Sequence, residues 1–335
     1  MRRSEISAEL IDAKRIAADQ LLTGAGPPRR QPSWVVRTHP DHNVVGIGVG
    51  RKIKRGKSTR TRCVRVYVER KIPRHLVPPN HLIPENVGGM VTDIIEAGRF
   101  RAFLPRLPAS QKRLRPARPG CSVGFQFPDA QAGELMAGTL GAVVTADGVP
   151  HILSNNHVLA NENTLPPGTP IFQPGLLDSG NAATDRIATL ARFVPLETDK
   201  PNRVDCALAA IVDVSAVAPA IPPKIGRLTS PDPIEADEGM QVEKTGRSTG
   251  YTTGTVFDVS ATVPVQFELG TLIFEDQILI RSDGSAFSDG GDSGSLIVDH
   301  GSGRATGLLL GGSLQFAIAN HIEDVLQALN AKLVC

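Results

Sequence analysis

Three polar motifs occur in one order along this chain, and each lies beside an apolar run. A histidine stands in Ser154–Ala160, an aspartate in Val204–Ala209 and a serine in Gly290–Ser295. Unrelated folds that bring these three side chains together do so in different chain orders. The order therefore limits which folds this chain can adopt.

The three residue types together predict acyl-transfer chemistry. A serine hydroxyl is a poor nucleophile at neutral pH, so it needs a base to take its proton and a third group to orient that base. His157 fits the role of the base, Asp205 that of the orienting acid and Ser293 that of the nucleophile. The backbone N–H groups of Gly291 and Ser293 would form the oxyanion hole, because a glycine two residues before the serine lets the backbone present them.

The order excludes two alternatives. An α/β-hydrolase requires Gly-x-Ser-x-Gly followed by its acid and then its histidine, but Ser295 stands where the second glycine belongs. The subtilisin order would place an acid motif before His157, and none stands there. The remaining order, His157, Asp205 and then Ser293 between Asp292 and Gly294, resembles that of the trypsin-like (chymotrypsin-fold) serine proteases.

A closer resemblance is to the branch of trypsin-like peptidases that includes plant Narrow Leaf 1 and its bacterial relatives. It extends over roughly residues 115–335 and, more weakly, into the N-terminal third. The strings that carry it are Gly138–Gly141, Ser154–Ala160, Gly246–Gly250, Gly291–Val298 and Gly307–Ser313, together with His42–Gly50 and Val64–Val68 upstream.

The pattern of short apolar runs is that of a mainly β fold. Turn residues separate the runs, as in barrels and sandwiches. The predicted strands are 138–145, 151–154, 186–194, 205–214, 241–244, 255–265, 272–280, 295–298, 305–310 and 315–319. The resemblance implies a two-β-barrel protease domain. Apolar residues at three- and four-residue steps predict a closing amphipathic helix over His321–Leu333.

The N-terminal third predicts a separate small α+β domain. Its elements are an amphipathic helix over Ser4–Leu22, strands over Val44–Arg51, Cys63–Glu69 and Met90–Glu96, and a basic loop over Lys52–Thr61. We therefore expect a leader domain over residues 1–104, a basic proline-rich linker over 105–119 and the protease domain over 120–335.

Composition excludes other classes of function. The apolar fraction is 41%, and 36 basic residues against 34 acidic ones give a net charge of +2, so neither nucleic acid nor a membrane surface is expected as a partner. Four cysteines show no metal-ligand spacing, which predicts no cofactor and no metal site. Free cysteines and the lack of an apolar leader run predict cytoplasmic residence.

The predicted function is that of a serine endopeptidase with a specific protein or peptide target. In this fold the base of the specificity pocket comes from the sixth residue before the serine, here Phe287, with a wall from Leu310, Gly311 and Gly312. An apolar base argues against cleavage after Arg or Lys. The sequence leaves three matters open: a catalytically silent scaffold that only binds peptides, activation by cleavage near Arg113–Arg118, and assembly into a homo-oligomer, which the resemblance allows.

Overall fold

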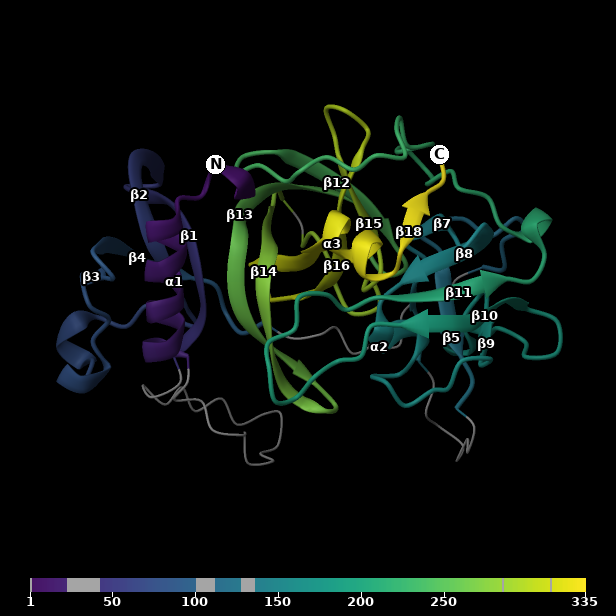
Figure 1. The fold of residues 1–335 in the computed structure, drawn as a ribbon, viewed down its shortest axis with the longest axis horizontal. Coiled ribbons are helices and arrows are strands. Elements are labelled where there is room, and N and C mark those ends of the chain that lie inside the picture. Colours follow the sequence, from purple (N-terminus) through teal and green to yellow (C-terminus); the bar gives the residue numbers. More distant parts are fainter. Residues whose placement is uncertain (1, 23–42, 101–111, 128–135, 285, 314) are drawn as a thin grey trace.

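Two β-sheets organise the molecule, as the ribbon in Figure 1 shows. The computed structural model describes residues 2–22, 43–100, 112–127, 136–284, 286–313 and 315–335. One sheet has ten strands and the other eight. The predicted fold class, mainly β with a C-terminal helix and a small α+β part at the N-terminal side, is confirmed.

Six strands of the larger sheet close into a barrel in the order β12-β15-β16-β17-β14-β13. Closure depends on the length of β13, which pairs through its first residues with β12 and along most of its length with β14. A closed barrel leaves no unpaired edge among its own strands. The strands are β12 (Gln241–Gly246), β13 (Gly250–Phe267), β14 (Gly270–Ser282), β15 (Leu296–Asp299), β16 (Ala305–Gly312) and β17 (Phe316–His321).

The smaller sheet has the order β18-β7-β8-β11-β10-β9-β5-β6. Its strands β6 and β7 are consecutive in the chain, so the bend at Leu140–Gly141 brings the sheet back to β5. A Cβ at Gly141 would lie 2.2 Å from the Gly294 carbonyl oxygen, so the bend requires glycine. The strands are β5 (Ser122–Phe125), β6 (Gly138–Thr139), β7 (Ala142–Ala146), β8 (Val149–Ser154), β9 (Pro170–Phe172), β10 (Arg186–Phe193), β11 (Ala207–Ile211) and β18 (Ala331–Leu333).

The predicted closing helix is wrong over its last residues. Helix α3 spans Ile322–Ala328, the chain turns at Asn330 with φ of +44°, and β18 then pairs with β7. Leu333 continues the helical spacing but is buried in this added strand. Pairing with the edge of the smaller sheet satisfies backbone groups that a longer exposed helix would leave to solvent.

The leader region contributes the other four strands of the larger sheet, in the order β1-β2-β4-β3. Its elements are the 3₁₀ helix η1 (Arg3–Glu5), α1 (Ala8–Leu21), β1 (Val44–Lys54), β2 (Lys57–Val68), η3 (Arg74–Leu76), η4 (Pro79–His81), β3 (Asn86–Val87) and β4 (Met90–Glu96). The predicted basic loop is wrong in extent, because β1 and β2 continue to a two-residue turn at Arg55–Gly56, where both φ angles are positive. Such a turn matches the twist of a hairpin, so most of the basic side chains stand on strands.

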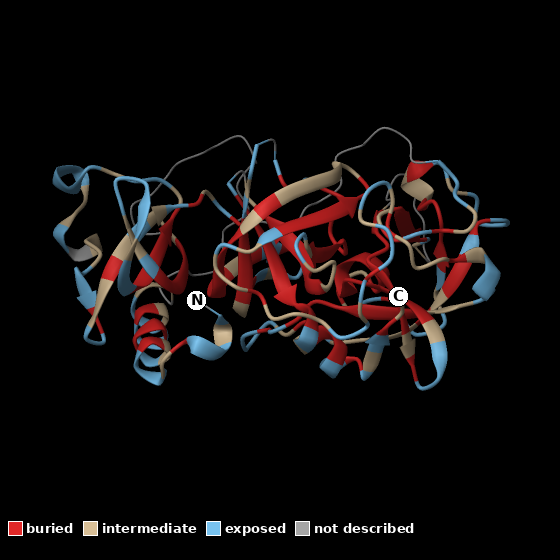
Figure 2. Cartoon of the chain, turned by 90° about the horizontal axis from the view of Figure 1, so that it is seen from above, coloured by how far each residue is buried: buried red, intermediate tan, exposed pale blue. Residues whose placement is uncertain are grey.

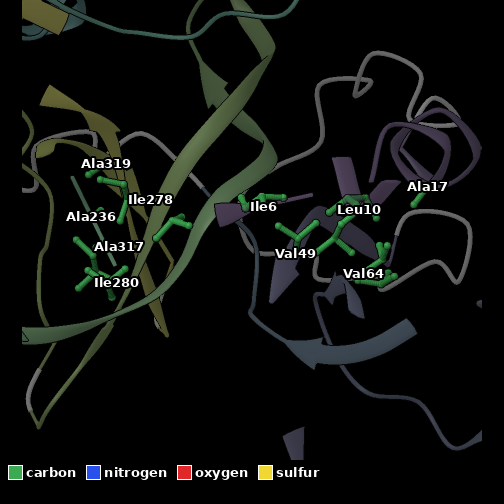
Figure 3. Close-up of a cluster of buried hydrophobic side chains, with 14 of the residues drawn as sticks. Ile6, Leu10, Ala17, Val49, Val64, Ala236, Ile278, Ile280, Ala317 and Ala319 are labelled. Carbon is green, nitrogen blue, oxygen red and sulfur yellow. The ribbon is translucent and has the colours of Figure 1, made fainter. Parts of the chain in front are cut away.

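One hydrophobic cluster joins the leader region to the larger barrel. Strand β1 pairs with β13, with Ile47 opposite Thr262. Figure 3 shows Leu10 and Val49 of the leader side and Ile278 of the barrel side in this cluster. In Figure 2 the buried residues run from the leader region into the barrels. Residues 105–111 of the predicted linker lie outside the described residues, and the division into domains stays a prediction.

Candidate active site

His157 and Asp205 lie in direct contact. Helix α2 (Asn156–Leu159) follows β8 and places His157 where its Nδ1 hydrogen-bonds Asp205 Oδ2. The His157 backbone N–H donates to the other carboxylate oxygen at 3.2 Å. An ionised carboxylate only accepts, so Nδ1 carries a proton in this contact. His157 Nε2 is buried and has no hydrogen-bond partner within the described residues.

Hydrogen bonds with residues of both barrels hold the backbone of Asp205 in place. The side-chain amide of Asn155 donates to the Asp205 carbonyl oxygen at 2.7 Å, and the Asp205 N–H donates to Asn320 Oδ1 at 3.0 Å. Asn320 belongs to β17 and donates in turn to Gln277 on β14. Sequence reasoning missed Asn320 and Gln277, because a buried amide in a strand has no distinguishing motif.

Ser293 does not hydrogen-bond His157. Its Oγ donates to the carbonyl oxygen of Leu310 on β16 at 3.1 Å, and the side chain is fully buried. The structure therefore joins two of the three predicted catalytic side chains and turns the third toward a neighbouring strand. Serine side chains occupy staggered wells about 120° apart, so one χ1 rotation separates this arrangement from another.

The turn before β15 presents two N–H groups at Ser293. Within the described residues, the N–H groups of Gly291 and Ser293 donate to no protein acceptor, whereas those of Asp292 and Gly294 donate to Asp289 O and Leu309 O. Gly291 has φ of +93°, a conformation that favours glycine. Two unused donors that flank a serine form a suitable cradle for an oxyanion.

The carboxylate of Asp292 has its cation within the chain. Lys244 Nζ lies 3.0 Å from Asp292 Oδ2, and both side chains are fully buried. The carboxylate also accepts from the N–H groups of Ser248, Thr249 and Asp289. Burial lowers the pKa of Lys244, and the neighbouring carboxylate counteracts the shift. Neutralising Asp292 therefore requires no new N-terminus from cleavage near Arg113–Arg118.

A buried ion pair and a threonine join the two barrels beside the turn. Arg247 donates from Nη2 to Asp178 Oδ1 at 2.7 Å, and Asp178 ends the 3₁₀ helix η5 (Leu176–Asp178) of the first barrel. Thr139 donates from its backbone to Ser293 O at 2.9 Å and from its hydroxyl to Gly291 O at 2.8 Å. These contacts fix the turn relative to the barrel that carries His157.

The tip of the β13–β14 hairpin covers His157. The ring of Phe267 lies edge-on to the imidazole, with 5.7 Å between ring centroids. The carboxylate of Glu162 accepts from the N–H groups of Glu268 and Leu269 at this tip, at 3.1 and 2.8 Å. Burial raises the pKa of Glu162, and the two backbone donors oppose that shift. Neither Phe267 nor Glu162 carries a sequence motif that could have identified it.

Of the predicted pocket residues, Phe287 lines a small cavity, whereas Leu310, Gly311 and Gly312 do not line it. Phe287 is buried and, with Phe316 and Ala317, lines a cavity of about 10 Å³. Leu310, Gly311 and Gly312 lie on β16 beside β17, and the Leu310 carbonyl accepts the Ser293 hydroxyl. No charged side chain lines this cavity among the described residues.

The remaining candidates have structural partners. His151 Nδ1 lies 2.8 Å from the Val149 carbonyl oxygen, and Cys206 is fully buried with a pKa well above its ordinary value because of desolvation. His39 and His42 lie outside the described residues. The described ranges contain no cluster of His, Cys, Asp or Glu suited to a metal ion. None of their helices has the length and hydrophobicity that a bilayer-spanning segment requires.

Known proteins resemble this chain in sequence. A family model described as the Nal1 C-terminal domain matches residues 206–320. Protein NARROW LEAF 1 of Oryza sativa subsp. japonica is 28% identical over 300 residues, which cover 80% of this chain and 51% of the relative. The chain thus spans about half the length of this curated relative.

Solved structures with a similar arrangement cover 65% of this chain. Thermobifida fusca Protease A is 20% identical with a TM-score of 0.46, over 99% of its own chain. A glutamic acid specific serine protease is 18% identical with a TM-score of 0.46, over 100% of its chain. Cellulomonas bogoriensis chymotrypsin is 16% identical with a TM-score of 0.43, over 98% of its chain. The family-model match lies in the part of the chain that carries Ser293 and leaves His157 outside it.

Proposed function

We propose that this protein is a serine endopeptidase that cleaves a specific protein or peptide target through Ser293, His157 and Asp205. The observation that carries the proposal is the geometry around Ser293. His157, whose Nε2 is open, is oriented by Asp205, and the N–H groups of Gly291 and of Ser293 itself are unused within the described residues. This combination supplies a base, an orienting acid and an oxyanion cradle.

In the proposed mechanism, rotation about χ1 moves the Ser293 hydroxyl from Leu310 O toward His157 Nε2. His157 takes the hydroxyl proton as Ser293 attacks the peptide carbonyl, and the N–H groups of Gly291 and Ser293 hold the oxyanion. Asp205 stabilises the imidazolium that forms. His157 then protonates the leaving amine and activates water, which hydrolyses the acyl-enzyme.

For specificity we propose a small or apolar residue on the N-terminal side of the cut. Phe287 provides an apolar surface, and the adjacent cavity has room for about one water molecule. A lysine or arginine would be buried there without a carboxylate, at a cost of several kcal/mol by the order of magnitude of a desolvated charge. Cleavage of a peptide library dominated by Arg or Lys sites would contradict this assignment.

Labelling with a fluorophosphonate probe tests the proposed nucleophile. We expect folded protein to be labelled at Ser293, and labelling to be lost in Ser293→Ala and strongly reduced in His157→Ala. Ser215→Ala is the control, because this exposed serine belongs to the 3₁₀ helix over Val214–Ala216 and lies outside the proposed mechanism and pocket. Folded protein that takes up no label would overturn the proposal.

A peptide-binding scaffold without catalysis is the second candidate. The observation that favours it is the hydrogen bond from Ser293 to Leu310 O, which directs the hydroxyl away from His157. If this arrangement persists on binding, the protein holds peptides without cutting them. A casein digest followed by mass spectrometry separates the two functions, with Ser293→Ala as the blank: new termini in wild type alone support the peptidase.

A further inference from the structure

A cavity lies in the leader region, away from Ser293. Its volume is about 640 Å³, within the range of ligand sites. One wall is the first half of β4, and the other is the segment of residues 70–86 that carries η3 and η4. In Figure 1 β3 and β4 lie at the end of the molecule opposite the barrel of β7–β11.

Strand β4 has an open backbone edge at this cavity. In a strand, alternate residues direct their N–H and C=O groups to the same side. Ala97 donates to Val68 O on β2, whereas Thr92 donates to Glu85 O on the opposite side. Ile94 and Glu96 therefore direct their backbone groups to the side of Thr92, away from β2.

No strand of the described residues pairs with that side of Ile94 and Glu96. Strand β3 pairs only with Met90 and Val91. The last contact of the preceding chain with this edge is the hydrogen bond from the Thr92 N–H to the Glu85 carbonyl oxygen. The Thr92 carbonyl is satisfied by Lys52 Nζ at 2.7 Å. The open part of the edge is thus short. Ile94, which is 38% exposed, lines the cavity, whereas Glu96 lies two residues beyond the lining, where its carboxylate accepts from the Lys71 N–H.

The cavity wall combines apolar side chains with an excess of positive charge. Its described lining contains more basic than acidic side chains: Lys52, Arg70, Lys71 and Arg74, compared with Glu85 and Asp93. The Asp93 carboxylate already accepts from the Ile53 N–H, and Arg74 pairs with Glu85 in an exposed contact. The side chains of Arg70 and Lys71 make no ion pair in the described structure, so they can meet an added carboxylate.

We propose that this cavity binds an extended peptide segment that alternates acidic and apolar residues, adding it as a strand to the open edge of β4. The backbone of Ile94 and Glu96 supplies the ladder hydrogen bonds, and the peptide side chains meet the apolar residues and the cations Arg70 and Lys71, which line the same cavity. Because a strand presents alternate faces, one peptide satisfies both requirements. The site requires no catalysis and stands independently of the proposed peptidase.

Fluorescence anisotropy with a labelled synthetic peptide of alternating Glu and Val tests the site. The host is full-length Ser293→Ala, which excludes cleavage of the probe. We expect saturable binding to this peptide and none to its Lys-Val counterpart. Binding by neither peptide, or equal binding by both, overturns the proposal.

Two variants separate the backbone and charge contributions. Ile94→Pro removes an N–H that β2 does not use, and proline is tolerated at sheet edges, so the protein folds but cannot extend the ladder. Arg70→Glu with Lys71→Glu reverses the charge. We expect each to weaken binding at least about tenfold, or about 1.4 kcal/mol. The matched control, Arg60→Glu with Arg62→Glu, makes the same charge change on the exposed β1–β2 hairpin and leaves affinity unchanged.

The same variants show whether the open edge of β4 binds a peptide or a second copy of this chain. Sedimentation velocity of the wild type and of Ile94→Pro reports self-association through this edge. Three results together would show that the edge pairs with another copy: the wild type self-associates, the peptide does not displace the second copy, and Ile94→Pro abolishes self-association. The peptide proposal would then be wrong. The proposal is also overturned if all of the cavity variants bind the peptide with wild-type affinity.

Discussion

At the scale of single residues, the candidate site depends on side chains that hold other groups in position. Asp205 orients His157, and Lys244 holds the carboxylate of Asp292 beside the turn that presents Gly291 and Ser293. A buried carboxylate without its cation is strongly destabilising, even when the pair as a whole contributes little net stability. We therefore expect the conformation of this turn to depend on an intact Lys244–Asp292 ion pair.

Replacing Lys244 by Met tests this dependence. We expect the free energy of unfolding to fall by about 3 to 5 kcal/mol, because the Asp292 charge stays buried without a partner. Fluorophosphonate labelling of Ser293 should fall as the turn loses its anchor, and Lys244→Arg should retain more of both properties. Urea unfolding and labelling rates measure the two effects, with the exposed Lys200→Met as control. Wild-type stability in Lys244→Met would contradict the role of the pair.

Replacing Glu162 by Ala tests the hairpin tip over His157. The variant removes the acceptor of the Glu268 and Leu269 N–H groups, whose net contribution is about 1 kcal/mol each. We expect kcat/KM to fall by about tenfold, because Phe267 no longer stays against the imidazole, and the free energy of unfolding to fall by about 2 kcal/mol for the two lost hydrogen bonds. Steady-state kinetics beside Glu9→Ala, an exposed carboxylate on α1, measures the effect. Unchanged kcat/KM would show that the tip does not position His157.

At the scale of elements, junctions between strands and helices place buried polar groups in the core. His321 ends β17 and precedes α3, and its Nε2 lies 2.9 Å from the Val259 carbonyl oxygen on β13. A carbonyl only accepts, so Nε2 donates and the ring is neutral when Nδ1 is unprotonated. Burial lowers the pKa of His321 to about 4 from its ordinary 6.5. This junction is therefore sensitive to acid.

The sign of that sensitivity follows from which state binds the proton. Between about pH 6.5 and about pH 4 the unfolded His321 is protonated and the folded one is not, so stability is lost as pH falls. We expect His321 alone to lower the free energy of unfolding by about 2 kcal/mol between about pH 7 and about pH 5. Urea unfolding at both pH values, compared with His321→Gln, measures it. Equal pH dependence in both proteins would rule out this contribution.

At the scale of the whole molecule, the leader region and the larger barrel share a sheet and a hydrophobic cluster. Lys14 of α1 is buried against Ser260 Oγ and Asp276 of the barrel, at 3.0 and 3.1 Å. Arg3 reaches the same carboxylate, and these cations and the Ser260 hydroxyl hold the pKa of Asp276 below its usual range against the effect of burial. Such an interface couples the stability of the two parts.

Replacing Leu10 by Ala tests the coupling. Leu10 is fully buried in the shared cluster, so we expect the loss of about 2 to 5 kcal/mol that is typical of a large-to-small change in a core. Because the cluster spans both parts, hydrogen exchange should rise in β13 and β14 as well as in β1 and β2. The exposed Ile16→Ala on the same helix is the control. Exchange that rises in the leader strands alone would show that the barrel is independent.

Much of the site could be predicted because local motifs specify it. The order of His157, Asp205 and Ser293, the glycine at position 291 and the alternation of short apolar runs with turns all belong to local sequence. The mainly β fold follows from the same runs. Helix α3 was predicted at its start and not at its end, because the spacing of Leu329 and Leu333 fits a helix until the edge of β7 offers a better pairing for the backbone.

The sequence by itself determined which residue types are available for acyl transfer and in which order the chain brings them. Only the tertiary structure decided that Lys244 neutralises Asp292, that Ser293 turns to Leu310 O, that Glu162 holds the hairpin tip over His157 and that β4 keeps an open edge. The physical reason is that these contacts join residues far apart in the chain. Their energies come from burial and from satisfying polar groups in the folded core, which no local pattern encodes.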